Sequence, residues 1–353
     1  PALARLCNLS PQGLAAGLEA VLGGVRRGPA TALLARARSV GPPAVDGPVL
    51  VVLAANLPAL AVQPLLPALA LRRPVLLKSP SAEPLFAPAF VAALAAREPR
   101  LERAVAALTW RGGEAEIEAP LLAGARTILA YGEHAMIEDL ERRAPGKVLG
   151  YGPKISLAAV GSGAALERAA EGLARDVALF DQRGCLSIAA VYTTGDALEL
   201  ARLLAEALAR LARQWPPGPL DAAAVAVQQV RLEAEMRGLA PPGLAARPLA
   251  QGTVIVEPEP TLQPSPGLRT VRIHPLADFA RLPAILAPWR GRLQGVAMAG
   301  IAGEEARQLA AGLTALGVSR LAEPGELQSP DASWHNGGID PLAALAGIAE
   351  LTV

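Results

Sequence analysis

Short apolar runs alternate with longer segments of mixed polarity along most of the chain. Residues 48–56 (PVLVVLAAN) and 73–79 (RPVLLKS) predict two strands, and residues 57–71 between them predict a buried helix. Both strands are apolar along most of their length, which is typical of a parallel sheet that helices cover on both faces. The alternation continues with helices expected over 83–98 and 134–144 and strands over 104–110 and 126–132. The first half therefore predicts a doubly wound parallel sheet.

A second α/β unit begins near residue 160. Helices are expected over 164–179, 196–214, 276–289 and 304–317, and strands over 187–194, 252–258, 269–275 and 293–300. The chain has 353 residues, of which 52% are hydrophobic, and is long enough to fill two cores. We therefore expect an α/β protein of two domains, which cover residues 1–157 and 158–353.

The run from residue 47 to residue 71 contains no charged side chain, so a membrane span is an alternative for it. Four prolines interrupt the run, at Pro48, Pro58, Pro64 and Pro67. Each proline lacks a backbone donor, and lipid cannot replace the missing hydrogen bond. The prolines favour a strand, a turn and a helix, and we expect no membrane span.

The composition argues against a nucleic-acid partner and for a reducing compartment. Lysine plus arginine (33) nearly balance aspartate plus glutamate (32), so no nucleic-acid-binding surface is expected. Two cysteines do not make a disulfide framework, and the N-terminal residues lack the pattern of a signal peptide, which favours a reducing cytoplasm. The three histidines, His134, His274 and His335, are too scattered to predict a metal site.

Cys185 lies in a short polar stretch, FDQRGCLSI, between an expected helix and an expected strand. Gly184 allows close approach of the backbone and Arg183 can favour the thiolate, which is the setting of a nucleophile. The alternative is a small buried hydrophobic residue, and the flanking residues alone leave both interpretations open. Cys7, near a terminus and without a supporting motif, is expected to be incidental.

The order of four segments along the chain indicates a family resemblance. They are VVLAANLPALAVQPLLPALALRRPVLLKSPS, TILAYG, VLGYGPKISLAAV and FDQRGCLS, and SRLAEPGELQSPDASWHNGGIDPLAALAGI follows near the end. In order and spacing the chain resembles the aldehyde dehydrogenase superfamily, and more narrowly the acyl-CoA reductase branch typified by the fatty-acid reductase of bacterial luminescence. The resemblance runs from about residue 46 to the end, and it implies a nucleotide-binding domain over 1–157 and a catalytic domain over 158–353.

The resemblance implies two catalytic residues. Cys185 would be the nucleophile that takes the acyl group, and its backbone N–H together with the Asn56 side chain would donate to the developing oxyanion. Without the resemblance, Asn56 is equally well explained as a turn residue that ends a strand before Pro58.

The resemblance also implies a cofactor site for NADPH, which is favoured over NADH. Lys78 matches the lysine that meets the adenosine ribose or its 2′-phosphate, and Gly132 matches the glycine that lets the phosphates approach a helix N-terminus. The residues assigned to this site are Lys78, Ser79, Ser81, Gly132, Gly150 and Gly152. As bare sequence features, Lys78 is a solvated strand end and Gly132 an ordinary turn.

Two departures from the superfamily pattern carry consequences. Hydrolytic relatives have a water-activating glutamate where this chain has Val148, Leu149 and Gly150, so an acyl-enzyme would persist until a thiol or a hydride removes it. The glutamate-phenylalanine-glycine-proline run that grips the nicotinamide ribose is replaced by EPTLQPSPGLRTV, where Glu257 and Glu259 are the nearby acids.

The resulting prediction is an enzyme that reduces an acyl-CoA, with a fatty acyl chain favoured, to the aldehyde with NADPH. The expected partners are acyl-CoA or another activated acyl donor, and an acyl-transferring synthetase and a homodimer are both compatible with the resemblance. The alternatives are a reductase of the glutamyl-phosphate type and a non-catalytic relative that binds an acyl carrier or a partner enzyme.

Overall fold

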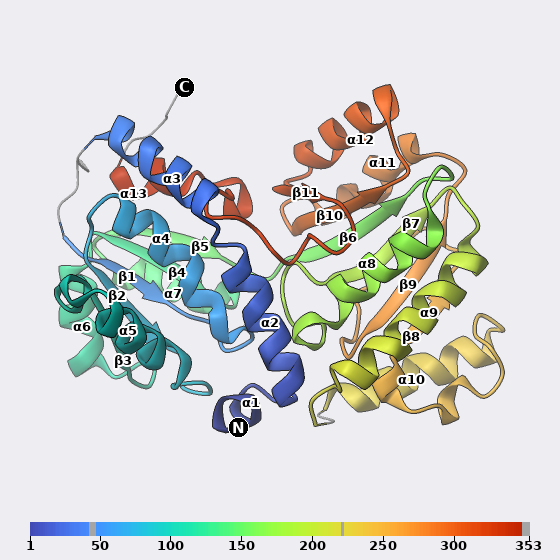
Figure 1. Cartoon of the computed structure of the whole chain (residues 1–353), viewed down its shortest axis with the longest axis horizontal. Helices are drawn as coiled ribbons and strands as arrows, with labels where there is room; N and C mark the ends of the chain where they lie inside the picture. Colours follow the sequence, from blue (N-terminus) through green and yellow to red (C-terminus); the bar gives the residue numbers. More distant parts are fainter. Residues whose placement is uncertain (42–46, 220–221, 348–353) are drawn as a thin grey trace. The chain divides into compact units, whose positions relative to one another are not determined.

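Two parallel sheets organise the chain, which the computed structural model describes over residues 1–41, 47–219 and 222–347 (Figure 1). Parts of both expected domains, at 42–46, 220–221 and 348–353, lie outside the described residues. The chain folds into two compact units, the first made of Pro1–Cys7, Ala20–Pro153 and the residues from Pro330 onward, and the second of Asn8–Glu19 and Lys154–Ser329. The chain passes from the first unit to the second at Pro153–Lys154, and the tail returns to the first unit.

The first unit contains a five-stranded sheet in the order β3-β2-β1-β4-β5, and every neighbouring pair is parallel. Its strands are β1 (Val49–Val52), β2 (Val75–Ser79), β3 (Val105–Thr109), β4 (Thr127–Tyr131) and β5 (Lys147–Tyr151). Its helices are α1 (Ala2–Leu6), α3 (Arg27–Val40), α4 (Val62–Ala70), α5 (Phe86–Arg97), α6 (Ala115–Gly124), α7 (His134–Arg143) and α13 (Pro341–Ala346), and α2 (Pro11–Gly23) continues into it from the second unit.

The two faces of this sheet are covered by different helices. Ile128 and Ala130 of β4 pack in one cluster with Ile137 and Leu140 of α7. Because neighbouring residues of a strand point to opposite faces, Leu129 and Tyr131 face the other side. There α4 packs against α3 and α13. The sheet is therefore covered on both faces, as its apolar strands predict.

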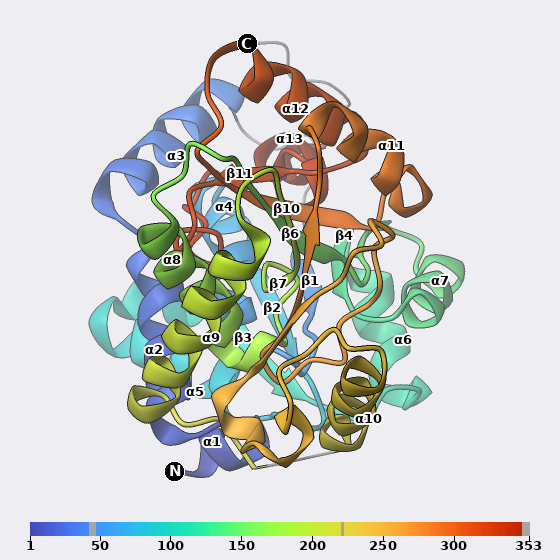
Figure 2. The same cartoon turned by 90° about the vertical axis from the view of Figure 1, so that its right-hand side faces the viewer.

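The second unit contains a six-stranded parallel sheet in the order β11-β10-β6-β7-β9-β8. Its strands are β6 (Ile155–Val160), β7 (Ile188–Thr193), β8 (Thr253–Val256), β9 (Thr270–Pro275), β10 (Leu293–Ala299) and β11 (Arg320–Ala322), and its helices are α8 (Leu166–Ala178), α9 (Ala197–Gln214), α10 (Ala223–Met236), α11 (Leu282–Leu286) and α12 (Gly303–Ala315). Helices α8 and α9 lie side by side in both views (Figures 1 and 2). Leu282 and Leu286 of α11 and Leu309 and Leu313 of α12 pack on the core of this unit.

The structure confirms the α/β class and corrects several elements. The uncharged run 47–71 forms β1, a 3-10 turn (Pro58–Ala61) and α4, and no helix in the described part of the chain is long and apolar enough to cross a membrane. The helix expected over 276–289 is wrong in length, because α11 spans only Leu282–Leu286 between two 3-10 turns. Helix α6, which contains Pro120, and the short edge strand β11 were not expected from the pattern.

Candidate functional site

Cys185 lies in a loop of the second unit, between the 3-10 turn Leu179–Gln182 and β7. The Ser156 hydroxyl on β6 donates to the Cys185 carbonyl over 2.7 Å. Gly184 and Ser187 close the loop reciprocally, since the Gly184 N–H donates to Ser187 Oγ and the Ser187 N–H donates to the Gly184 carbonyl. The loop is therefore held by hydrogen bonds on both sides of the cysteine, which is itself half-buried.

The three residues Phe180, Asp181 and Gln182, which precede this loop, have left-handed backbone conformations, with φ of 53°, 50° and 64°. Such conformations are costly for residues other than glycine and persist where surrounding contacts enforce them. The Gln182 amide donates to the carbonyls of Ile188 (2.7 Å) and Thr270 (2.8 Å) and accepts from the Thr270 N–H (2.8 Å). These contacts tie the strained turn to the ends of β7 and β9.

A buried ion pair also holds this turn. Arg269 donates to Asp181 Oδ1 over 2.7 and 3.0 Å, and both side chains are almost completely buried. The Gly218 N–H donates to the other carboxylate oxygen of Asp181 over 2.8 Å. No local pattern of residues signalled Asp181, Gln182 or Arg269, because their partners are distant along the chain.

Burial raises the pKa of the Cys185 thiol to about 11, while its own backbone N–H, the Lys154 ammonium and the Leu186 N–H lower it. Lys154 is thus a cation that acts on the thiol, and the sequence had drawn attention to Arg183 instead. Burial in turn lowers the pKa of Lys154, and the charge of Cys185 raises it. The N–H groups of Cys185 and Leu186 favour negative charge at the sulfur, which is the electrostatic requirement of a nucleophilic thiol.

Asn56 lies in the first unit, in an exposed turn between β1 and the 3-10 turn that begins at Pro58. This position fits the turn role that the sequence left open. Asn56 also follows the carboxyl end of a parallel strand, and ligands of open α/β sheets bind at the carboxyl ends of the strands.

Lys78 and Ser79 end strand β2 and are both buried. The Lys78 ammonium lies 5.3 Å from the centre of the Trp110 ring, and burial lowers its pKa while Glu118 and Glu114 raise it. Lys78 is therefore not the solvated strand end that the bare sequence allowed. The Ser79 hydroxyl is fully buried and finds no partner among the described residues.

Glu118 on α6 connects this cluster to α7. Its carboxylate accepts from the Trp110 indole N–H over 3.1 Å and from Arg143 over 2.8 Å. Two cations, Lys78 and Arg143, thus act on one carboxylate. The sequence did not single out Trp110, Glu118 or Arg143.

The expected glycines lie at the carboxyl ends of β4 and β5. Gly132 precedes α7, as the resemblance implies. A Cβ at Gly150 would lie 2.5 Å from Ile137 Cγ2, and one at Gly152 would lie 2.7 Å from the His134 ring. Close packing of α7 therefore already explains these two glycines. Ser81 lies beyond β2 and is exposed.

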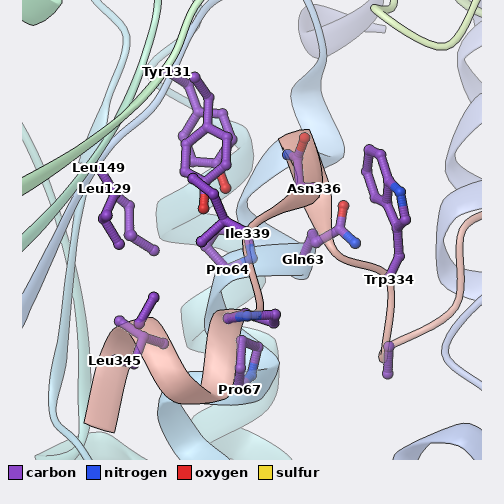
Figure 3. A pocket seen from close by; sticks show the side chains of 14 residues that line it. Gln63, Pro64, Pro67, Leu129, Tyr131, Leu149, Trp334, Asn336, Ile339 and Leu345 are labelled. Atoms are coloured by element: carbon purple, nitrogen blue, oxygen red, sulfur yellow. The ribbon is translucent and has the colours of Figure 1, made fainter. Parts of the chain in front are cut away.

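The two departures from the superfamily pattern are visible in the structure. Strand β5 reads KVLGY and carries no carboxylate. Its Val148 packs against the cluster beneath α7, and its Leu149 lines a pocket on the opposite face of the sheet (Figure 3). Glu257 is fully buried and paired with Arg237 (2.8 Å) and Arg272 (3.2 Å), whereas Glu259 is exposed.

No cluster of three or more His, Cys, Asp and Glu side chains that could hold a metal ion occurs within residues 1–41, 47–219 and 222–347. His274 is fully buried and stacks on Tyr192, with ring centres 4.9 Å apart.

A family model described as "Acyl-CoA reductase (LuxC)" matches residues 39–348. The chain is 28% identical over 153 residues to the long-chain acyl-protein thioester reductase 2 of Photobacterium leiognathi, an alignment that covers 42% of this chain and 32% of the relative. It is 30% identical over 173 residues to the long-chain acyl-protein thioester reductase of Aliivibrio fischeri, covering 47% and 36%. These alignments span about a third of the curated relatives' length.

Solved structures resemble the fold. An oxidoreductase from Marinobacter aquaeolei matches with a TM-score of 0.63 and 17% identity, over 81% of this chain and 62% of its own. An aldehyde dehydrogenase from Mycobacterium tuberculosis, solved in complex with NAD+, matches with a TM-score of 0.59 and 15% identity, over 79% and 61%. The expected aldehyde dehydrogenase-like fold is confirmed.

Proposed function

Because this chain belongs to the acyl-CoA reductase (LuxC) family, whose model matches residues 39–348, we propose that it reduces an activated fatty acyl thioester to the aldehyde. The donor would be acyl-CoA or an acyl group on a protein, since the relatives are named long-chain acyl-protein thioester reductases. The observation that carries the proposal is Cys185, held in a hydrogen-bonded loop in which burial raises the pKa of the thiol while its own N–H, the Lys154 ammonium and the Leu186 N–H lower it.

In the proposed reaction the Cys185 thiolate attacks the thioester carbonyl, and the donor thiolate leaves from the tetrahedral intermediate. The Cys185 N–H and the Asn56 amide would donate hydrogen bonds to the oxyanion, and these hydrogen bonds would strengthen as negative charge develops on that oxygen. The two residues belong to different units, and the proposal that they act on one carbonyl derives from the family resemblance.

The residues that the resemblance assigns to nucleotide binding lie in the first unit and are compatible with a phosphorylated dinucleotide. A buried ammonium (Lys78) and a buried hydroxyl without a partner among the described residues (Ser79) lie at the carboxyl end of β2, and Gly132 precedes the N-terminus of α7. We propose that these residues, with Ser81, Gly150 and Gly152, hold NADPH in preference to NADH. Bound there, the reduced nicotinamide would supply the hydride that converts the acyl-enzyme to a thiohemiacetal.

Collapse of the thiohemiacetal releases the aldehyde and returns the Cys185 thiolate. The Lys154 ammonium lowers the pKa of this thiol, and therefore favours it as a leaving group. Strand β5 presents Val148, Leu149 and Gly150 where hydrolytic relatives carry their base, so the acyl-enzyme would be protected from hydrolysis.

The proposal is tested with hexadecanoyl-CoA and NADPH, by aldehyde formation and by the intact mass of the acyl-enzyme. Cys185→Ala should abolish both while leaving nucleotide binding nearly unchanged, because the thiol is the sole covalent participant. Cys7→Ala is the matched control and should be silent. Substantial turnover by Cys185→Ala would refute the nucleophile. A wild-type protein that binds the acyl donor without turning it over would favour the non-catalytic alternative.

A further inference from the structure

Helix α2 has a glycine at a position where a helix disfavours it. Gly17 lies inside α2 and is buried, and glycine destabilises a helix interior relative to alanine. A Cβ at Gly17 would lie 2.4 Å from Cε1 and 2.6 Å from Cζ of the Phe180 ring, closer than van der Waals contact allows. Position 17 therefore requires a residue without a side chain, because the Phe180 ring packs directly on the backbone of α2.

Phe180 belongs to the strained turn that precedes Cys185. Its side chain is almost completely buried, and its backbone is left-handed, with φ of 53°. The Phe180 carbonyl accepts from the Arg183 N–H over 3.1 Å, which ties Phe180 to the start of the loop that carries Cys185. Because protein interiors are close-packed, a displacement of the Phe180 ring is transmitted to this backbone.

The residues that precede α2 contact the same turn by a second route. The Ser10 hydroxyl donates to the Pro216 carbonyl. A Cβ at Gly218 would lie 2.0 Å from the Asn8 carbonyl oxygen, so these two backbone segments are in direct contact. The Gly218 N–H in turn donates to Asp181 over 2.8 Å. The N-terminal residues therefore hold the turn through α2 and also through residues 216–218.

We propose that the segment Asn8–Glu19 positions the Cys185 thiol, and that Gly17 is the positioning residue that sets how closely α2 approaches the turn. Every contact in this chain of packing lies within the second unit. The segment precedes residues 39–348, which the family model matches, so the family match does not account for it. That the positioned thiol takes an acyl group rests on the proposed function.

Gly17→Ala tests this inference against a control in the same helix. The added methyl group would displace the Phe180 ring and loosen the turn, so the thiol should lose part of the burial that raises its pKa to about 11. The pH profile of iodoacetamide alkylation at Cys185 should move to lower pH, and the rate near neutral pH should rise about tenfold for each unit by which the pKa falls. Gly23→Ala is the matched control and should leave the profile unmoved, because Gly23 ends α2 and a Cβ there would meet nothing within 4 Å.

Two further variants separate positioning from a general loss of stability. Phe180→Leu shortens the side chain that meets the new methyl group, so adding it to Gly17→Ala should return the profile toward that of Phe180→Leu alone. Ser10→Ala removes the hydroxyl that contacts Pro216 and should move the profile in the same direction by less, which tests the inference even if Gly17→Ala does not fold. Alkylation is measured by mass spectrometry of the Cys185 peptide, and urea titration verifies that each protein is folded.

Three results would overturn the inference. They are an unmoved or raised profile in folded Gly17→Ala, or in Ser10→Ala if Gly17→Ala does not fold; an equal shift in Gly23→Ala; and a shift that Phe180→Leu does not reduce. Alkylation requires neither substrate nor cofactor, so it is independent of the proposed reaction. With hexadecanoyl-CoA and NADPH, Gly17→Ala should lower kcat with little change in KM, since the thiol acts in acyl transfer. A moved alkylation profile in a chain whose wild-type form reduces no acyl thioester would refute the proposed function alone.

Discussion

The reactivity of Cys185 toward iodoacetamide follows directly from the electrostatics of its loop. In a Cys7→Ala protein Cys185 is the remaining thiol. Burial raises its pKa from the ordinary 9.0 to about 11, and alkylation requires the thiolate. Each pKa unit changes the thiolate fraction tenfold at pH values below the pKa, so Cys185 should be alkylated roughly 100-fold more slowly than an unperturbed thiol near neutral pH. The rate should rise about tenfold per pH unit until the pH approaches 11.

The variant Lys154→Met tests how much the Lys154 ammonium contributes to the pKa of Cys185. Because the Lys154 ammonium lowers the thiol pKa, its removal should shift the whole rate profile to higher pH, and Lys154→Arg should restore part of the shift. The extent of carbamidomethylation at Cys185 is measured by mass spectrometry across the pH range, with an unstructured cysteine peptide as the reference. Alkylation as fast as that of the peptide, or an unmoved profile in Lys154→Met, would refute the reasoning. A change in rate on adding NADPH would favour the enzyme over a non-catalytic relative.

The remaining predictions concern donors, cofactor, water and pH. Asn56→Ala should reduce turnover roughly 10²- to 10³-fold with little change in KM, and an unchanged rate would return Asn56 to a turn role. Lys78→Ala should weaken NADPH more than NADH in a fluorescence titration; equal weakening would mean that Lys78 does not read the 2′-phosphate. Aldehyde and NADP+ without CoA should yield almost no free carboxylic acid, and rapid acid formation would show that another group activates water. Burial raises the pKa of Asp176 from 3.8 to about 7, outweighing the N–H donors of Gly325, Gln328 and Leu327. The folded protein therefore keeps a proton that the unfolded chain releases, and the free energy of unfolding should fall by up to about 4 kcal/mol as pH rises through this window. Asp176→Asn should lack that fall in urea titrations on either side of the window, and an equal fall in both proteins would contradict the assignment.

The strands that position the site were largely predictable from local pattern. The apolar runs at 48–56, 73–79 and 126–132 became β1, β2 and β4, because a strand covered on both faces has few polar positions. Prediction failed where local preference was weak or interrupted. Helix α6 contains Pro120, and β11 has only three residues at the sheet edge.

The candidate functional residues divide in the same way. Cys185 and Asn56 could be proposed from the sequence because each stands in a recognisable segment of the family order. Lys154 could not, since its relation to Cys185 depends on two strands, β6 and β7, lying side by side in the sheet. Glu118 could not be predicted either, because its partners Trp110 and Arg143 come from other elements, the end of β3 and α7.

The sequence by itself determined the α/β class, the parallel strands and the candidate nucleophile, because periodicity and motif order are properties of consecutive residues. The tertiary structure alone showed that Lys154 acts on the thiol, which contacts hold the strained turn before it, and that the tail returns to the first unit. The packing of the Phe180 ring on Gly17 is the clearest case. The two residues lie far apart in the chain, and their contact exists only once packing has brought the segments together.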